Sequence, residues 1–293
     1  MKIRTALREI LRNEDINFLL TNRLPRNLLT RFVGWFSKIR QPLVCRCSIG
    51  AWKLFTDLDL SDASTTHFAS LHECFTRALR AGARSIDGAA DVLVSPSDGI
   101  VGECGAVQQG GLLQAKGMSY RLAELLGSAA DAARYANGTY ATLRLTSAMY
   151  HRFHAPHDMA IDTVNYISGD TWNVNPIALK RVERLFCRNE RAVIHARLDA
   201  GGHRIILVPV AAILVASIRL HCANVLLHLR YRGPNQIACQ AAVSKGQELG
   251  WFEHGSTIIV LAPCGFTLCD GVHTGATLRM GQAFMHLPSH GHK

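Results

Sequence analysis

Hydrophobic residues near the start of the chain recur at the spacing of an amphipathic helix. Between Pro25 and Pro42 the apolar side chains share one helical face, with polar and basic side chains opposite. Because proline disfavours helical continuation, residues 1–43 are predicted to form two or more helices, broken at Pro25 and ended near Pro42. Another amphipathic helix is predicted over residues 67–80. The apolar positions of the first stretch are Leu28, Leu29, Phe32, Val33, Phe36 and Ile39.

From about residue 90 the pattern changes to short runs of branched residues separated by Gly, Pro, Asn and Asp, which is typical of strands. Residues 205–218 form an apolar run that contains Pro209, and this run is predicted to be two buried strands, or one strand and its bend. A short helix with a serine cap and a terminal glycine is predicted over residues 119–127. The predicted strands are 92–94, 139–146, 192–198, 204–218, 225–231 and 256–261.

These patterns predict an α+β fold. A basic, helical N-terminal region is expected over residues 1–89, followed by a β-rich, sandwich-like or barrel-like catalytic domain over residues 90–293. With 293 residues, of which 48% are hydrophobic, the chain can bury a large core. No internal repeat or low-complexity linker separates the two regions, so they are expected to pack as one body.

The cysteines and histidines point away from disulfides and metals. The nine cysteines are odd in number and scattered, with no CxxC pair, which favours thiols in a reducing compartment. The fourteen histidines show no HExxH or similar spacing. We therefore expect no metal site.

Positive charge is concentrated at the N-terminus. The chain has a formal net charge of +10, and residues 1–43 hold nine Lys or Arg against three acidic residues, which gives a local charge of +6. A basic amphipathic helix suits a membrane interface, although core packing produces the same periodicity. Nucleic-acid binding is not favoured, because the basic residues are interleaved with aliphatic ones. No apolar run reaches the roughly 18 to 20 residues of a spanning helix, and no signal peptide is expected.

The pair Gly255-Ser256 directly precedes a predicted strand and has two interpretations. Taken alone, the tetrapeptide His254 to Thr257 favours a tight turn that leads into the apolar run. Alternatively, an acyl shift onto the serine hydroxyl could break the Gly255-Ser256 bond. The new terminal serine could then lose water and, by hydrolysis, ammonia, and so become a pyruvoyl group.

Two other segments supply the groups that a reacting serine needs. Asp98 follows a predicted strand in the sequence Pro-Ser-Asp-Gly, and His151 and His154 lie three residues apart in Tyr-His-Arg-Phe-His. In a Ser-His-Asp arrangement, histidine takes the hydroxyl proton and aspartate stabilises the imidazolium. Each segment also has a structural explanation, as a turn, a solvated loop or a strand start.

Together these segments resemble the phosphatidylserine decarboxylase family, in order and along most of the chain. The matching segments are 75–84 (FTRALRAGAR), 95–99 (SPSDG), 114–117 (QAKG) with Tyr120, 150–154 (YHRFH), 174–176 (VNP), 185–191 (LFCRNER), 214–218 (LVASI), 245–252 (KGQELGWF) and 255–257 (GST). His254 departs from the pattern, because the family usually has leucine there. None of the departures removes a reacting group.

The resemblance implies a self-cleaving proenzyme that converts phosphatidylserine to phosphatidylethanolamine and carbon dioxide. Cleavage between Gly255 and Ser256 would give a β chain, 1–255, and an α chain, 256–293, which stay associated. Asp98, His154 and Ser256 match the self-cleavage triad, and His151 matches a residue on the substrate side. The cofactor would be the pyruvoyl group made from Ser256, which forms a Schiff base with the lipid amine and accepts electrons as carbon dioxide leaves.

Two other functions stay open at this point. One is a serine hydrolase that uses the same triad without self-cleavage, and the other is an inert lipid-binding relative. The resemblance also implies an anionic membrane surface as a partner and a peripheral location on the cytoplasmic face of the cell membrane, with the mitochondrial inner membrane as the alternative. Assembly into a homo-oligomer is left open.

Overall fold

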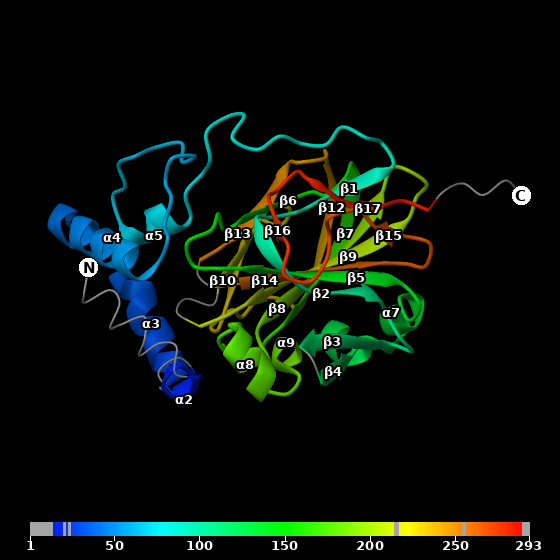
Figure 1. Ribbon diagram of the computed structural model, residues 1–293, viewed down its shortest axis with the longest axis horizontal. Helices are drawn as coiled ribbons and strands as arrows, with labels where there is room; N and C mark the ends of the chain where they lie inside the picture. The colour runs from blue at the N-terminus through cyan, green and yellow to red at the C-terminus, as the bar shows by residue number, and fades with distance from the viewer. Residues whose placement is uncertain are drawn as a thin grey trace, which may run out of the picture.

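A computed structural model describes residues 14–19, 22, 25–115, 117–213, 217–253 and 256–288. The N-terminal helices lie at one end of the molecule and the β-rich part forms the rest (Figure 1). Several sequence predictions lie outside the described residues, among them the basic positions before Glu14, His254 and Gly255, and the C-terminal tail after Pro288. The N-terminal helices are α2 (Glu14–Phe18), α3 (Arg26–Phe36), α4 (Pro42–Phe55) and α5 (Leu71–Phe75).

Pro42 begins a helix, whereas the sequence pattern predicted that a helix ends near it. Helix α3 ends at Phe36, and Pro42 is the first residue of α4. Proline is tolerated at this position because the first amide groups of a helix have no intrahelical acceptor. The Gln41 side chain caps the helix by accepting a hydrogen bond from Val44 N at 2.6 Å. No helix in the described part of the chain is long and apolar enough to cross a membrane.

Two other predicted helices are shorter than expected. The helix predicted over residues 67–80 is only the five-residue α5, capped by Ser70 Oγ, which accepts from Glu73 N at 3.1 Å. Beyond it, Leu79 forms an isolated β-bridge with Ala63. In the segment 119–127, the first residues belong to a strand, so tertiary pairing overrides the local helical pattern. The short helices of the β-rich part are α6 (Leu122–Leu126), α7 (Ala129–Arg134), α8 (Pro176–Arg181) and α9 (Leu185–Arg188).

An eight-stranded antiparallel sheet forms the centre of the β-rich part. Of the two alternatives for residues 205–218, the structure shows the first, because the run contributes to two strands, β9 (Arg204–Ala211) and β10 (Ser217–Leu220). In spatial order the sheet comprises β12 (Gln236–Val243), β7 (Met159–Ile167), β8 (Arg191–Leu198), β9 (Arg204–Ala211), β14 (Ser256–Ala262), β5 (Thr139–Leu145), β2 (Gly99–Ala106) and β16 (Thr277–Leu278).

Three smaller sheets complete the β-rich part. None of the four sheets in the described residues closes into a barrel. The α+β class with helices before a β-rich region is confirmed, whereas the boundary at residues 89 and 90 stays a prediction. The smaller sheets are β1 (Val92–Val94), β17 (Ala283–His286) and β15 (Thr267–Leu268); β11 (Val225–His228), β10 (Ser217–Leu220), β13 (Glu248–Phe252) and β6 (Arg152–His154); and β3 (Gly111–Ala115) with β4 (Met118–Arg121).

Strand β14 is buried on both faces. Alternate residues point to opposite sides of a strand, and here Ile258 and Val260 join one hydrophobic core while Ile259 and Leu261 join another. All seven residues of the strand are buried. This explains why the sequence of β14 is a continuous apolar run rather than an alternating one.

Aromatic contacts attach the helical end to the β-rich part. The rings of Trp52 in α4 and Phe75 in α5 stack with centroids 5.6 Å apart, and Phe75 in turn lies 4.0 Å from the ring of His151. The backbone of α5 is also tied to the end of α3, because His72 N donates to Ser37 O at 2.8 Å. The helices therefore contact the segment that carries the predicted histidines.

We predict that Gly250→Ala destabilises the protein. A Cβ atom at Gly250 in β13 would overlap the carbonyl oxygen of Arg219 in the neighbouring strand and approach Phe153 Cζ to 3.0 Å. Overpacking of this kind costs about 1–3 kcal/mol of unfolding free energy, and a backbone atom cannot swing aside. Urea unfolding of the purified variant measures the loss.

Gly102→Ala is the matched control. Gly102 also lies in a strand, but a Cβ there would meet Thr142 atoms no closer than 3.6 Å, which is ordinary van der Waals contact. Its unfolding midpoint should stay near that of the parent. Equal midpoints for both variants would show that close packing at Gly250 does not constrain the fold.

Candidate active site

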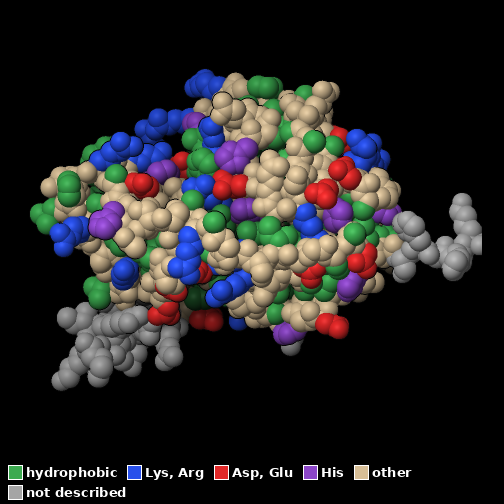
Figure 2. Space-filling model, turned by 90° about the horizontal axis from the view of Figure 1, so that it is seen from above, with side chains coloured by type: hydrophobic (Ala, Val, Ile, Leu, Met, Phe, Trp, Pro, Cys, Tyr) green, Lys and Arg blue, Asp and Glu red, His purple; other side chains and the backbone are tan. Residues whose placement is uncertain are grey.

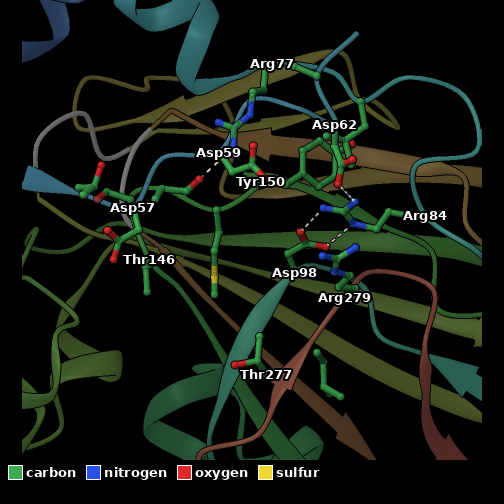
Figure 3. Close-up of a pocket in the computed structure, with 17 residues that line it drawn as sticks. Asp57, Asp59, Asp62, Arg77, Arg84, Asp98, Thr146, Tyr150, Thr277 and Arg279 are labelled. Atoms are coloured by element: carbon green, nitrogen blue, oxygen red, sulfur yellow. Dashed lines mark hydrogen bonds and ion pairs between the residues drawn. The ribbon is translucent and has the colours of Figure 1, made fainter. Parts of the chain in front are cut away.

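Asp98 is held in the turn between β1 and β2 by a two-point ion pair. Arg84 Nε donates to Oδ1 at 2.9 Å and Arg84 Nη2 donates to Oδ2 at 2.6 Å. Met280 N donates to Oδ1 at 2.9 Å. Arg84 Nη1 also donates to Asp62 at 2.8 Å, so this guanidinium lies between two carboxylates, as Figure 3 shows. These carboxylates raise the pKa of Arg84, with hydrogen bonding to Asp98 as the largest cause.

His154 ends strand β6, next to the turn that carries Asp98. Its backbone N–H donates to Pro96 O at 2.8 Å. In the ring, Nδ1 lies 2.9 Å from Gly246 O, and Nε2 lies 2.9 Å from the hydroxyl of Tyr150. Because a carbonyl can only accept, Nδ1 carries the proton, and Nε2 of the neutral ring accepts from Tyr150. Burial lowers the pKa of His154, which favours this neutral form.

His151 is fully buried and lies three residues before His154. Its Nδ1 lies 2.9 Å from Met149 O, so this nitrogen also carries a proton. The His151 backbone carbonyl accepts from Phe252 N at 2.9 Å, which places His151 beside the segment that leads to Ser256. The contact with Phe75 covers one face of the ring.

Ser256 is the first residue of β14 and is fully buried. It is paired with Leu145 in β5 on one side and with Ala211 in β9 on the other. Within the described part of the chain, its Oγ has no hydrogen-bond partner. A buried hydroxyl without a partner is unfavourable by about 1–3 kcal/mol, so this position calls for an explanation other than stability.

The fold brings the four predicted residues into adjoining segments. Leu145 lies opposite Ser256, and from there the chain runs through residues 146–150 directly into His151 and His154. Among the residues that the structure covers, however, no hydrogen bond joins Asp98 to His154, or either of them to Ser256. Arg84 and Tyr150 are bound to Asp98 and His154 instead.

A cavity of about 540 Å³ lies beside Asp98 (Figure 3). Tyr150 and Arg84 line it, and residues 146–149 form another part of its wall. Thr56, which follows α4, also lines this cavity, so the cavity reaches from the helical end to Asp98. Tyr150 therefore connects the cavity with the ring of His154.

Arg152, the central residue of the Tyr-His-Arg-Phe-His segment, has a positioning role. Its Nη1 donates to both carboxylate oxygens of Glu248 at 3.1 and 2.9 Å, and its Nη2 donates to Thr76 O at 2.8 Å. The guanidinium also lies over the Trp251 ring, 5.2 Å from the centroid. These contacts hold β6, which contains His154 and directly follows His151, against β13 and the end of α5.

Sequence reasoning missed Arg84 and Tyr150 as partners of the predicted site residues. Both lie inside segments that the family resemblance includes, 75–84 and 150–154, so the signal was present but carried no assigned role. No group of three or more His, Cys, Asp or Glu suited to a metal ion occurs in the described ranges.

We predict that the His154 ring titrates below the usual histidine pKa of 6.5, because burial disfavours its charged form. NMR of a Ser256→Ala protein labelled at histidine measures this pKa, and His154→Gln assigns the signal. Since the unfolded chain then takes up the proton more readily, acidification through pH 6.5 should also lower this residue's contribution to the free energy of unfolding.

Tyr150→Phe provides the comparison for this titration. The hydroxyl of Tyr150 donates to Nε2 and stabilises the neutral ring, so its removal should raise the pKa of His154. A His154 signal that titrates at or above pH 6.5 in the parent protein would contradict the assignment of a neutral, buried ring.

Comparisons with known proteins show the family to which this chain belongs. A family model described as phosphatidylserine decarboxylase matches residues 71–286. A phosphatidylserine decarboxylase proenzyme of Brevibacillus brevis is 36% identical over 270 residues, covering 90% of this chain and 95% of that protein. Proenzymes of the same name from Shewanella baltica and Myxococcus xanthus are 33% and 34% identical, covering 94% and 92% of this chain and 97% and 98% of their own lengths. The chain belongs to the phosphatidylserine decarboxylase family.

Proposed function

We propose that this protein is a phosphatidylserine decarboxylase, a carboxy-lyase that releases carbon dioxide from phosphatidylserine and leaves phosphatidylethanolamine. Its family membership and the proenzyme names of its relatives support this activity. We further propose that the chain cuts itself between Gly255 and Ser256. The products are a β chain, 1–255, and an α chain, 256–293, whose first residue becomes a pyruvoyl group.

The observation that carries the proposal is the placement of Ser256. Its hydroxyl is fully buried and, within the described residues, lacks a hydrogen-bond partner, while its backbone is paired on both sides. A reacting hydroxyl needs this combination, because the backbone holds it in place and no other bond has to break before it attacks. The chemistry that a ketone supplies at this position is an electron sink for the bond that loses carbon dioxide.

His154 is proposed as the base for self-cleavage. Because Nδ1–H is bound to Gly246 O, Nε2 is the basic atom of the His154 ring. This nitrogen takes up the Ser256 proton after its hydrogen bond with the Tyr150 hydroxyl breaks. The lowered pKa of His154 keeps this nitrogen unprotonated at neutral pH. Asp98 contributes negative charge near the ring, and Arg84 keeps that carboxylate in place.

His151 is proposed to act on the substrate side. The proton on its Nδ1 is bound to Met149 O, so proton exchange with a substrate would use Nε2. Its contact with Phe75 fixes the ring plane. A proton delivered by a positioned side chain typically raises a rate by about 10²- to 10⁴-fold.

The two chains are proposed to remain associated after cleavage. Strand β14 would belong to the α chain, yet all its residues are buried between β5 and β9 of the β chain. Strands β16 and β17 pair with β2 and β1 in the same way. Separation would expose a strand from the centre of both hydrophobic cores.

The helical end is proposed to bind an anionic membrane surface. Of the nine exposed large hydrophobic residues in the described part of the chain, seven lie between Leu19 and Phe55. Figure 2 shows basic and hydrophobic side chains side by side over this end, at the left of the view. Apolar side chains that enter the interface and cations that attract anionic lipids are the two contributions to peripheral binding. We place the protein on the cytoplasmic face of the cell membrane, with the mitochondrial inner membrane as the alternative.

We predict that the purified protein consists of two fragments and that Ser256→Ala remains a single chain. Mass spectrometry measures both, and the smaller fragment should begin with a group that lacks the serine amine. His154→Gln should slow cleavage by about 10²- to 10⁴-fold, because it removes the base.

Matched variants separate chemistry from folding. His157 is another buried histidine, three residues after His154, and its ring is bound to Ala90 O and Asp158 O, so His157→Gln should change stability more than cleavage. Ser244→Ala should leave cleavage unchanged. An intact parent chain that a fluorophosphonate labels at Ser256 would support a serine hydrolase, and an intact, unlabelled chain that binds lipid would support an inert relative.

We predict that the double variant Phe32→Ser and Trp35→Ser binds anionic vesicles at least tenfold more weakly than the parent. These rings are 56% and 64% exposed on α3, and each loses its apolar contact with the interface. Co-sedimentation with phosphatidylglycerol vesicles measures the loss, and salt should weaken binding of the parent.

The control variant is Ile86→Ser with Leu113→Ser. These residues are also exposed, at 44% and 46%, but lie outside the N-terminal helices. Their replacement should leave vesicle binding unchanged. Equal loss in both double variants, or binding of the parent that ignores salt, would refute docking through α3.

A further inference from the structure

A second cavity, of about 350 Å³, lies between α3 and the β-rich part. One wall comes from Thr30 and Arg31 of α3 and from Lys38, which follows the helix. The opposite wall comes from β10, from the chain around β11, and from Glu253, which follows β13. Figure 1 shows α3 beside this edge of the β-rich part.

Cations outnumber anions around this cavity. Arg31, Lys38 and Arg230 line it together with a single carboxylate, Glu253. In the described part of the chain, neither Arg31 nor Arg230 forms an ion pair. Glu253 is buried and already engaged, since Lys38 Nζ lies 3.5 Å and His72 Nε2 lies 3.6 Å from its oxygens. Two guanidinium groups are therefore left for an anion.

His228 adds a hydrogen-bond donor to the same wall. Its Nδ1 accepts from Arg230 N at 3.1 Å, so the ring proton is on Nε2. Two polar residues that line the cavity, Thr30 and Ser217, are each only 4% exposed. The cavity thus has a buried polar floor beneath exposed cations.

The cavity lies close to Ser256 along the chain. Glu253 precedes Ser256 by three residues, so their Cα atoms are separated by no more than about 11 Å of extended chain. Glu253 N also donates to Ser217 O at 3.1 Å, which ties the cavity wall to the segment that enters the reacting position.

Helix α3 exposes large hydrophobic side chains on the face that points away from the cavity. Leu28, Phe32 and Trp35 are 66%, 56% and 64% exposed. Arg31 and Thr30 line the cavity and lie roughly 65° and 165° around the helix from the centre of that exposed face. A lipid whose chains lie against the exposed face would bring its headgroup around the helix to the cavity.

We infer that this cavity binds the phosphodiester of the lipid headgroup, through Arg31 and Arg230. This inference rests on the proposed function, which supplies a substrate with an anionic phosphate close to the reacting amine. Guanidinium groups match phosphate oxygens in a planar, two-point geometry. The phosphate in this cavity would direct the serine amine along the chain toward residue 256.

The test measures decarboxylation of a short-chain phosphatidylserine below its micellar concentration, so that membrane binding does not contribute. Arg230→Gln and Arg31→Gln should each raise KM about tenfold, because each removes a charge-assisted contact with the phosphate, while kcat changes less than twofold. Arg232→Gln, which removes a cation from the same loop but not from the cavity wall, should leave KM unchanged.

A second measurement separates this inference from the proposed function. Glycerophosphoserine, the headgroup without acyl chains, should bind the parent protein in calorimetry and bind Arg230→Gln about tenfold more weakly. Inorganic phosphate should compete poorly, because it lacks the serine part. If the parent does not decarboxylate the lipid, the proposed function fails. The inference is then tested only by the calorimetric affinities of the parent and Arg230→Gln for glycerophosphoserine. Unchanged KM values, or equal glycerophosphoserine affinity in parent and Arg230→Gln, would overturn it.

Discussion

The structure depends on the burial of strand β14 between β5 and β9. This strand contributes apolar side chains to two hydrophobic cores at once, and its first residue is Ser256. The Ser256 hydroxyl loses hydration and forms no hydrogen bond with the described residues. This loss is unfavourable for the stability of the folded protein. The ladders on both sides compensate, because they hold the backbone whether or not the preceding peptide bond is intact. In the proposed mechanism, one strand therefore positions the reactive group and keeps the two chains together.

The acid–base groups around this strand are each restrained by a neighbour. Arg84 binds Asp98 at two points, and Gly246 and Tyr150 bind the two nitrogens of the His154 ring. These contacts hold both side chains in place, and burial lowers the pKa of His154 and so favours its neutral ring. Tyr150 also lines the cavity beside Asp98, so a change in that cavity can reach the histidine through one hydroxyl.

Helix α3 joins the proposals for membrane and headgroup binding. Its exposed aromatic face suits a membrane interface. Its other side lines a cation-rich cavity whose opposite wall includes Glu253, three residues before Ser256. Phe75 connects the neighbouring helices to His151 by ring contacts. The helical end thus contacts the segment that carries His151.

The sequence by itself determined the local elements whose pattern is strong and the residue types of the site. Continuous branched runs predicted β1, β5 and β14, and the ordered segments around Asp98, His154 and Ser256 indicated the family. Local pattern misplaced Pro42 and overextended the helix at α5, because strand pairing and packing decide where a weak helix ends. Only the tertiary structure decided that Arg84 binds Asp98, that Tyr150 binds His154, and that α3 and the chain around β11 enclose a cavity. Periodicity specifies which face of an element is buried, whereas the partner across that face depends on contacts between residues far apart in the chain.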